Sequence, residues 1–209
     1  MRTDVPVKDS IPVPTASVAA PSSPSPAKAR PETTVCSVDL YGDSIMHGGY
    51  KGNLRLAEPP AATLKRLRPR YAVQDFSLNG ETATLRAKTF GSEPRTGRFV
   101  VIEHGINDTM QRLPLEVSLR SMIETVRREG REPILTGLSR QPVSIPGRTA
   151  ANQSIRRLAS DLRVPFADWD AVRFTPQEME DVLHPSKPYS DRLVKSIVEV
   201  LDRLAPECV

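Results

Sequence analysis

Residues 37–44 read SVDLYGDS, a short apolar run that ends in Gly42, Asp43 and Ser44. A run of this kind, closed by turn residues, is typical of a strand that is buried on both faces of a sheet. Four similar runs follow along the chain. The five expected strands cover Ser37–Gly42, Ala72–Leu78, Phe99–Gly105, Pro133–Ser139 and Val164–Trp169.

Helical stretches separate these runs. The helical period is clearest in residues 115–129, where Leu115, Leu119, Met122 and Val126 fall on one face. The segments between the strands are Pro60–Leu67, a short polar piece near Thr82–Lys88, and the helical stretches Leu115–Glu129, Arg148–Leu162 and Tyr189–Leu204. Strands that alternate with helices predict right-handed βαβ units and a parallel sheet. We therefore expect an α/β fold, a flavodoxin-like three-layer α/β/α domain with a five-stranded parallel sheet.

Proline sets the expected domain boundary. Seven of the 20 prolines fall within residues 1–35, a segment otherwise rich in Ser and Ala. Such a composition buries too little apolar surface to offset the entropy of ordering, so we expect a flexible tail over 1–35 and one domain over 36–209. The first ten residues, MRTDVPVKDS, lack the apolar segment that a signal peptide needs, so we do not expect an intact signal peptide.

Composition excludes several classes of protein. No apolar run approaches the roughly 20 residues that a membrane helix needs, so no integral membrane segment is expected. The net charge is +4, but the 29 Lys and Arg residues are interleaved with 25 Asp and Glu, which does not favour a nucleic-acid partner. Gly48–Gly52 lacks the spacing of a phosphate-binding loop, and we interpret the segment from Gly48 to Pro60 as a flexible cleft wall.

Polar residues follow the expected strands at their carboxyl ends, which meet at one edge of a parallel sheet. Ser44 follows the first strand, Gly80 the second and Asn107 the third, while Asp181 and His184 precede the last helix. These residue types suit acyl transfer. His184 can remove the Ser44 proton, and Asp181, three residues earlier, can orient the imidazole. Backbone N–H groups of Ser44 and Gly80 and the Asn107 amide can stabilise an oxyanion.

At these residues the sequence resembles the SGNH, or GDSL-type, hydrolase family. The four matching blocks are Tyr41-Gly-Asp-Ser-Ile, Leu78-Asn-Gly-Glu-Thr, Gly105-Ile-Asn-Asp and Asp181-Val-Leu-His-Pro, in family order. The resemblance implies that Ser44 is the nucleophile and that Asp181 and His184 complete a catalytic triad. It further implies that Gly80 and Asn107 complete the oxyanion hole, and that neither a metal nor an organic cofactor is needed.

Four further residues carry weaker expectations. His47 lies just after the nucleophile and is a candidate to line the substrate cleft, whereas His104 is expected to be a packed residue. Cys36 begins the first strand, and Cys208 follows a last helix that returns to the same end of the sheet. This proximity favours a disulfide and a secreted, periplasmic or cell-surface location, with two free thiols in a cytoplasmic enzyme as the alternative.

The short domain leaves little length for a lid, and few aromatic residues are available to hold a fatty chain. We expect a serine esterase that removes short acyl groups, O-acetyl above all, from a carbohydrate or cell-surface glycan. A short-chain lipolytic esterase or thioesterase is the alternative within the class. An O-acyltransferase and a non-catalytic glycan-binding module remain open as alternatives outside it.

Overall fold

The computed structural model describes Met1 and residues 35–209. The tail expected over residues 1–35 therefore lies, apart from Met1 and Val35, outside the described residues. In the described part of the chain, no helix is long and apolar enough to cross a membrane.

A five-stranded parallel sheet forms the centre of the fold, in the order β4-β1-β5-β6-β7. Its strands are β1 (Ser37–Gly42), β4 (Ala72–Asp75), β5 (Phe99–Glu103), β6 (Glu132–Thr136) and β7 (Phe166–Ala167). Every residue of β1 and β5 is buried, as expected for central strands covered on both faces. The order is that of a flavodoxin-like sheet, which confirms the expected topology.

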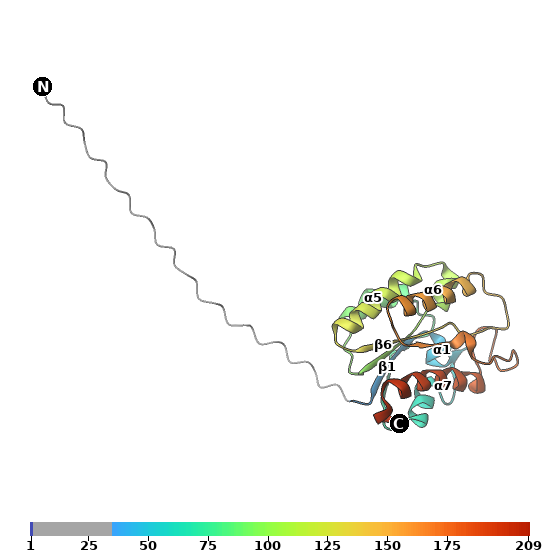
Figure 1. The fold of residues 1–209 in the computed structure, drawn as a ribbon. Helices are drawn as coiled ribbons and strands as arrows, with labels where there is room; N and C mark the ends of the chain where they lie inside the picture. Colours follow the sequence, from blue (N-terminus) through green and yellow to red (C-terminus); the bar gives the residue numbers. More distant parts are fainter. Residues whose placement is uncertain (2–34) are drawn as a thin grey trace. The chain divides into compact units, whose positions relative to one another are not determined.

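Helices cover both faces of this sheet (Figure 1), and those on each face contact one another. On one face α3 (Ala83–Thr89) and α6 (Arg148–Asp161) contact α5 (Leu115–Arg128), while on the other α2 (Pro60–Leu67) contacts α7 (Lys187–Leu204). In α5 and α7 the buried residues recur at helical spacing, so each helix places one apolar stripe on the sheet.

The remaining elements are short, and most of them lie near the carboxyl ends of the strands or at the chain's end. They are α1 (Ser44–His47), the antiparallel pair β2 (Gly49–Tyr50) and β3 (Leu54–Arg55), α4 (Ile106–Gln111), and the 3-10 turns η1 (Phe90–Ser92), η2 (Trp169–Ala171) and η3 (Pro206–Cys208). The sequence did not indicate α1, the β2–β3 hairpin or α4.

A disulfide joins Cys36, just before β1, to Cys208 in η3, with 5.6 Å between the Cα atoms. The bridge confirms the expected pairing and excludes two free thiols. It ties the start of the central strand to the end of the last helix, at the end of the sheet opposite Ser44.

Candidate active site

Ser44 is the first residue of helix α1, directly after the central strand β1. Asp43 precedes it as the N-cap, and one oxygen of its carboxylate accepts a hydrogen bond from the Ile45 N–H at 2.9 Å. An Asp at this position satisfies a backbone donor that the short helix leaves free. The cap and the buried strand together fix the place of Ser44, whose side chain lies at the carboxyl edge of the sheet.

The structure brings Ser44, His184 and Asp181 into one hydrogen-bonded chain. Ser44 Oγ lies 2.9 Å from His184 Nε2, and His184 Nδ1 lies 2.8 Å from both carboxylate oxygens of Asp181. With a proton on Nδ1 donated to Asp181, Nε2 can accept the proton of the Ser44 hydroxyl. This is the geometry required of a nucleophile, a general base and a group that orients the base.

Asp181 is held as a carboxylate by the groups around it. Burial raises its pKa, but hydrogen bonds from the Leu183 N–H, the His184 ring and the His184 N–H outweigh burial and lower the pKa below its ordinary value. The Lys51 N–H, 3.1 Å from Oδ2, adds a fourth donor. Asp181 therefore stays ionised across the neutral range and can stabilise an imidazolium on His184.

Gly80 and Asn107 line the same pocket as Ser44 and His184. Its volume is about 310 Å³, and its wall also includes Gly49, Tyr50, Gly52, Asn79 and Leu183. Gly80 has φ = +72°, a conformation that side-chain-bearing residues rarely adopt. A Cβ at Gly80 would meet no protein atom within 4 Å, so its backbone conformation and not crowding by the protein requires glycine there.

The hairpin β2–β3 forms one side of this pocket and contacts the other parts of the site. A Cβ on Gly49 would lie 2.1 Å from the Asn79 side-chain oxygen, so the hairpin approaches the Gly80 loop as closely as glycine allows. Asn79 Nδ2 donates to the Gly52 carbonyl at 3.4 Å, and the Lys51 N–H reaches Asp181. The segment expected to be flexible is instead a hydrogen-bonded hairpin, and its Lys51 N–H contacts Asp181.

Two buried acidic side chains, Asp43 and Glu103, lie beneath Ser44. Glu103, the last residue of β5, accepts a hydrogen bond from the Asp43 N–H at 3.1 Å. Burial, with like charges nearby, raises the pKa of Asp43 to about 7, and burial together with the charge of Asp43 raises that of Glu103 as well. Glu103 was not among the expected site residues, although an acidic residue at the end of an otherwise apolar strand is a signal that the sequence carries.

The other singled-out residues lie outside the pocket. His47 is partly buried and is not among the residues that line the pocket, so its role in substrate binding stays a prediction. His104 is buried, with Nε2 3.2 Å from the Glu81 carboxylate, as a packed residue should be. Within residues 35–209, no three His, Cys, Asp or Glu side chains are grouped so that they could hold a metal ion.

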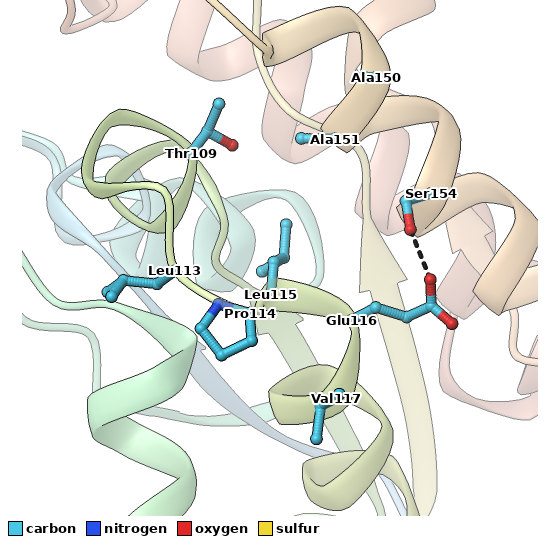
Figure 2. Close-up of a pocket in the computed structure, with 9 residues that line it drawn as sticks. All are labelled: Thr109, Leu113, Pro114, Leu115, Glu116, Val117, Ala150, Ala151 and Ser154. Carbon is cyan, nitrogen blue, oxygen red and sulfur yellow. Dashed lines mark hydrogen bonds between the residues drawn. The ribbon is translucent and has the colours of Figure 1, made fainter.

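A second hollow of about 350 Å³ lies between the start of α5 and α6 (Figure 2). Glu116 accepts a hydrogen bond from the Ser154 hydroxyl across it, at 2.7 Å. Its other lining residues are apolar or small, and none of the expected catalytic residues is among them. The chemistry therefore concentrates in the pocket beside Ser44.

Known structures share the fold of this chain. Solved structures with the same fold include one titled TesA (24% identity, TM-score 0.67, covering 80% of this chain and 99% of that one). Another is the psychrotrophic esterase EstA from Pseudoalteromonas sp., inhibited by monoethylphosphonate. It is 16% identical with a TM-score of 0.68, and the match covers 82% of this chain and 99% of that one. A third is a GDSL-like lipase from Bacteroides thetaiotaomicron. It is 19% identical with a TM-score of 0.62, and the match covers 84% of this chain and 92% of that one.

No protein with curated annotation matches the sequence. The family model of the GDSL-like lipases and acylhydrolases matches residues 40–188, a span that contains the Ser44, Gly80, Asn107 and Asp181–His184 segments. That span is most of the chain and includes every strand of the sheet beyond the first residues of β1. The chain therefore belongs to the GDSL-like lipase/acylhydrolase family.

Proposed function

We propose that this protein is a serine esterase that hydrolyses carboxylic esters through an acyl-enzyme on Ser44. The observation that carries the proposal is the chain Ser44 Oγ–His184 Nε2–His184 Nδ1–Asp181, with contacts of 2.9 and 2.8 Å. A serine hydroxyl is a weak nucleophile, and an adjacent oriented base is what activates it.

The reaction follows from these contacts. Ser44 Oγ attacks the ester carbonyl carbon while His184 Nε2 takes the hydroxyl proton. The carbonyl oxygen becomes an oxyanion that the Ser44 N–H, the Gly80 N–H and the Asn107 amide stabilise. His184 then gives its proton to the leaving alcohol as the C–O bond breaks. A water molecule, deprotonated by His184, attacks the acyl-enzyme in the same way and releases the acid and Ser44.

We propose short acyl groups, O-acetyl above all, on a carbohydrate or cell-surface glycan as the substrate. The pocket beside Ser44 is small, and glycines and asparagines form much of its wall. Polar amides and exposed backbone suit a hydroxylated carrier, and the small volume suits an acetyl group.

A second candidate, an esterase or thioesterase for longer apolar acyl chains, rests on a different observation. An apolar trough of about 290 Å³ shares Leu183 with the catalytic pocket. The other residues that line it are Met110, Val143, Ser144, Ile145, Pro146 and Val182. A chain longer than acetyl could extend from Ser44 over Leu183 into this trough.

Acetate release from p-nitrophenyl acetate and from a panel of acetylated glycans tests the proposal. Wild type should release acetate, and Ser44→Ala should lose all but background activity. Ser196→Ala, a serine of α7 whose hydroxyl donates to the Leu193 carbonyl, is the matched control and should be fully active. Folded wild type without activity on any ester would contradict the proposal and favour an acyltransferase or a binding module.

The acyl-chain profile separates the two substrate classes. Val143→Asp places a charge in the trough, whereas Val117→Asp places one in the hollow beside α5 and is the control. Activity that peaks at acetyl and is unchanged by Val143→Asp supports the short-chain substrate. A peak at longer chains that Val143→Asp alone abolishes supports the second candidate.

The Cys36–Cys208 bridge supports a secreted, periplasmic or cell-surface location, because structural disulfides persist in oxidising compartments. An acylated glycan outside the cytoplasm is consistent with that location.

A further inference from the structure

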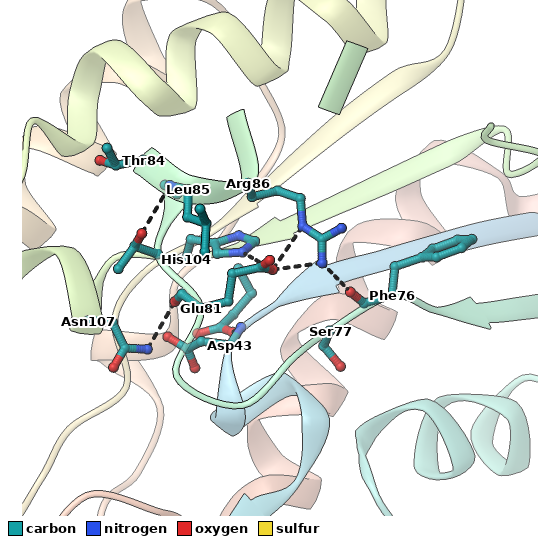
Figure 3. A network of polar contacts seen from close by, with 12 residues as sticks. Asp43, Phe76, Ser77, Glu81, Thr84, Leu85, Arg86, His104 and Asn107 are labelled. Carbon is teal, nitrogen blue, oxygen red and sulfur yellow. Dashed lines mark hydrogen bonds and ion pairs between the residues drawn. The ribbon is translucent and has the colours of Figure 1, made fainter. Parts of the chain in front are cut away.

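The two loops that carry the expected oxyanion donors are joined by a hydrogen bond. Asn107 Nδ2 donates to the backbone carbonyl of Glu81, the residue directly after Gly80, at 3.0 Å. An asparagine amide has two N–H groups. Because one of them is held by Glu81, the plane of the amide is fixed, and with it the direction of the second N–H. Figure 3 shows Asn107 and Glu81 joined in this way.

The Glu81 side chain points away from the pocket into a buried network. One carboxylate oxygen lies 2.8 Å from Arg86 Nε, 2.7 Å from Arg86 Nη2 and 3.2 Å from His104 Nε2. Glu81 and Arg86 are each 8% exposed, and His104 is 2% exposed. These three contacts hold the buried Glu81 carboxylate in one position (Figure 3). The peptide between Gly80 and Glu81 is therefore anchored through the Glu81 side chain.

Arg86 also reaches past Glu81 to the framework of the fold. Nη2 donates to the Phe76 carbonyl at 2.8 Å, just beyond β4, and Nη1 donates to both oxygens of Glu93 at 3.0 Å. Pairing with Glu81 alone would need neither of these two contacts. The planar guanidinium instead links the Gly80 loop to the end of β4 and to the segment after η1, which a lysine could not do.

We propose that Glu81 and Arg86 are positioning residues of the oxyanion hole, with Arg86 holding Glu81 so that the Gly80 N–H and the Asn107 amide converge on one point. The inference rests on the proposed function of Ser44. Neither residue touches the substrate. The Glu81 backbone fixes Asn107, and the Glu81 side chain fixes the loop of Gly80, so a single residue sets both donors. Donors act on the transition state only if they are in place before charge develops.

The test measures kcat and KM for p-nitrophenyl acetate in Arg86→Lys and in Glu81→Gln, which is nearly isosteric. We expect kcat to fall about 10- to 100-fold, which is less than the fall caused by removing an oxyanion donor altogether. KM should stay within about twofold of the wild-type value. The pH dependence of kcat/KM should keep its wild-type midpoint, because the Ser44–His184–Asp181 contacts are untouched. Both variants are assayed at a temperature where circular dichroism shows them folded.

Arg95→Lys is the matched control, because Arg95 is a buried arginine paired with Glu129 at the opposite end of the sheet. Its kcat should stay within about threefold of wild type even where its melting temperature falls as far as that of Arg86→Lys. The double variant Arg86→Met with Glu81→Gln removes both buried charges. It should recover thermal stability relative to Arg86→Met but not kcat, since the loop is no longer anchored.

Three outcomes would overturn the inference. They are a kcat within threefold of wild type in folded Arg86→Lys and Glu81→Gln, an equal loss of kcat in Arg95→Lys, or a double variant that recovers kcat together with stability. Full activity in Ser44→Ala would instead overturn the proposed function. A loss of activity in Ser44→Ala with no effect in the Arg86 and Glu81 variants would overturn only the positioning role.

Discussion

Asp108 belongs to helix α4, yet it caps helix α3 by accepting a hydrogen bond from the Ala83 N–H at 2.8 Å. Its second oxygen accepts from the Thr84 N–H at 3.0 Å. Both donors belong to the first turn of α3, where backbone N–H groups have no partner within the helix. The cap joins the segment of Asn107 to the segment of Gly80 a second time, next to the Asn107–Glu81 hydrogen bond.

Replacing Asp108 by alanine should destabilise the protein by about 1–3 kcal/mol, because two N–H groups at a buried helix start lose their acceptor. Urea unfolding at pH 7 measures the change. Asp161→Ala, an exposed aspartate at the end of α6, is the control and should shift the free energy of unfolding by less than about 0.5 kcal/mol. Equal effects of the two substitutions would show that the cap contributes nothing.

The disulfide should matter for stability and not for catalysis. Cys36 and Cys208 are separated by 172 positions, and closing so long a loop restricts the unfolded chain strongly. We expect Cys36→Ser with Cys208→Ser to lower the free energy of unfolding by about 2–5 kcal/mol. The specific activity at 25 °C should not change, because the bridge lies at the end of the sheet opposite Ser44.

Thiol counting provides the direct check on the bridge. Denatured protein without reductant should give no free thiol, and reduced protein should give two. A loss of specific activity in the folded Cys36→Ser, Cys208→Ser variant at 25 °C would show that the bridge also shapes the site.

Most of the architecture could be predicted because its signals are local. The strand Ser37–Gly42 and the helix Pro60–Leu67 have the expected bounds, since each is a continuous apolar or amphipathic run. The expected strand Val164–Trp169 is reduced to Phe166–Ala167, because pairing with β6 extends over only two residues. The hairpin β2–β3 was missed, since two strands of two residues leave no alternation to detect.

The residues of the proposed triad and oxyanion hole could be placed at one edge of the sheet because the strand ends of a parallel sheet meet there. What joins them could not be predicted. The Arg86–Glu81–His104 network links residues from separate elements, and its partners follow from packing of α3 against the sheet and not from spacing. The place of Glu103 beneath Asp43 depends on the parallel register that sets Gly42 opposite Glu103.

The buried acids Asp43 and Glu103 predict a pH dependence of stability. Burial raises both pKa values in the folded protein, so the folded state binds more protons than the unfolded state between about pH 4 and the raised values. The free energy of unfolding should therefore fall as pH rises through that window, by up to about 1.4 kcal/mol per pH unit for each proton released.

Glu103→Gln removes one of these titrating groups and keeps an oxygen to accept from the Asp43 N–H. Relative to wild type, it should gain stability steadily from pH 5 to pH 8 in urea unfolding. Glu124→Gln on the exposed side of α5 is the control, with a difference from wild type that stays within about 0.5 kcal/mol at every pH. A Glu103→Gln difference that is constant with pH would show that the Glu103 pKa is not raised by burial.

Gly49 should be essential to the shape of the catalytic pocket. In Gly49→Ala the new Cβ would lie 2.1 Å from Asn79 Oδ1 and 2.9 Å from Asn79 Cγ, so the Asn79 side chain must leave its position. That movement breaks the Asn79–Gly52 hydrogen bond and shifts the hairpin whose Lys51 N–H reaches Asp181. We expect kcat/KM to fall about 10-fold or more and stability to fall by about 1–3 kcal/mol, as for other overpacked sites.

Gly91→Ala is the matched control for this prediction, because a Cβ at Gly91 meets no atom within 4 Å and its φ is not positive. Its kcat/KM and unfolding free energy should equal those of wild type within error. Steady-state kinetics on p-nitrophenyl acetate and urea unfolding measure both variants side by side. Wild-type kcat/KM in Gly49→Ala would show that Asn79 can leave the pocket wall without disturbing Gly80 or Asp181, and the hairpin would then have no part in catalysis.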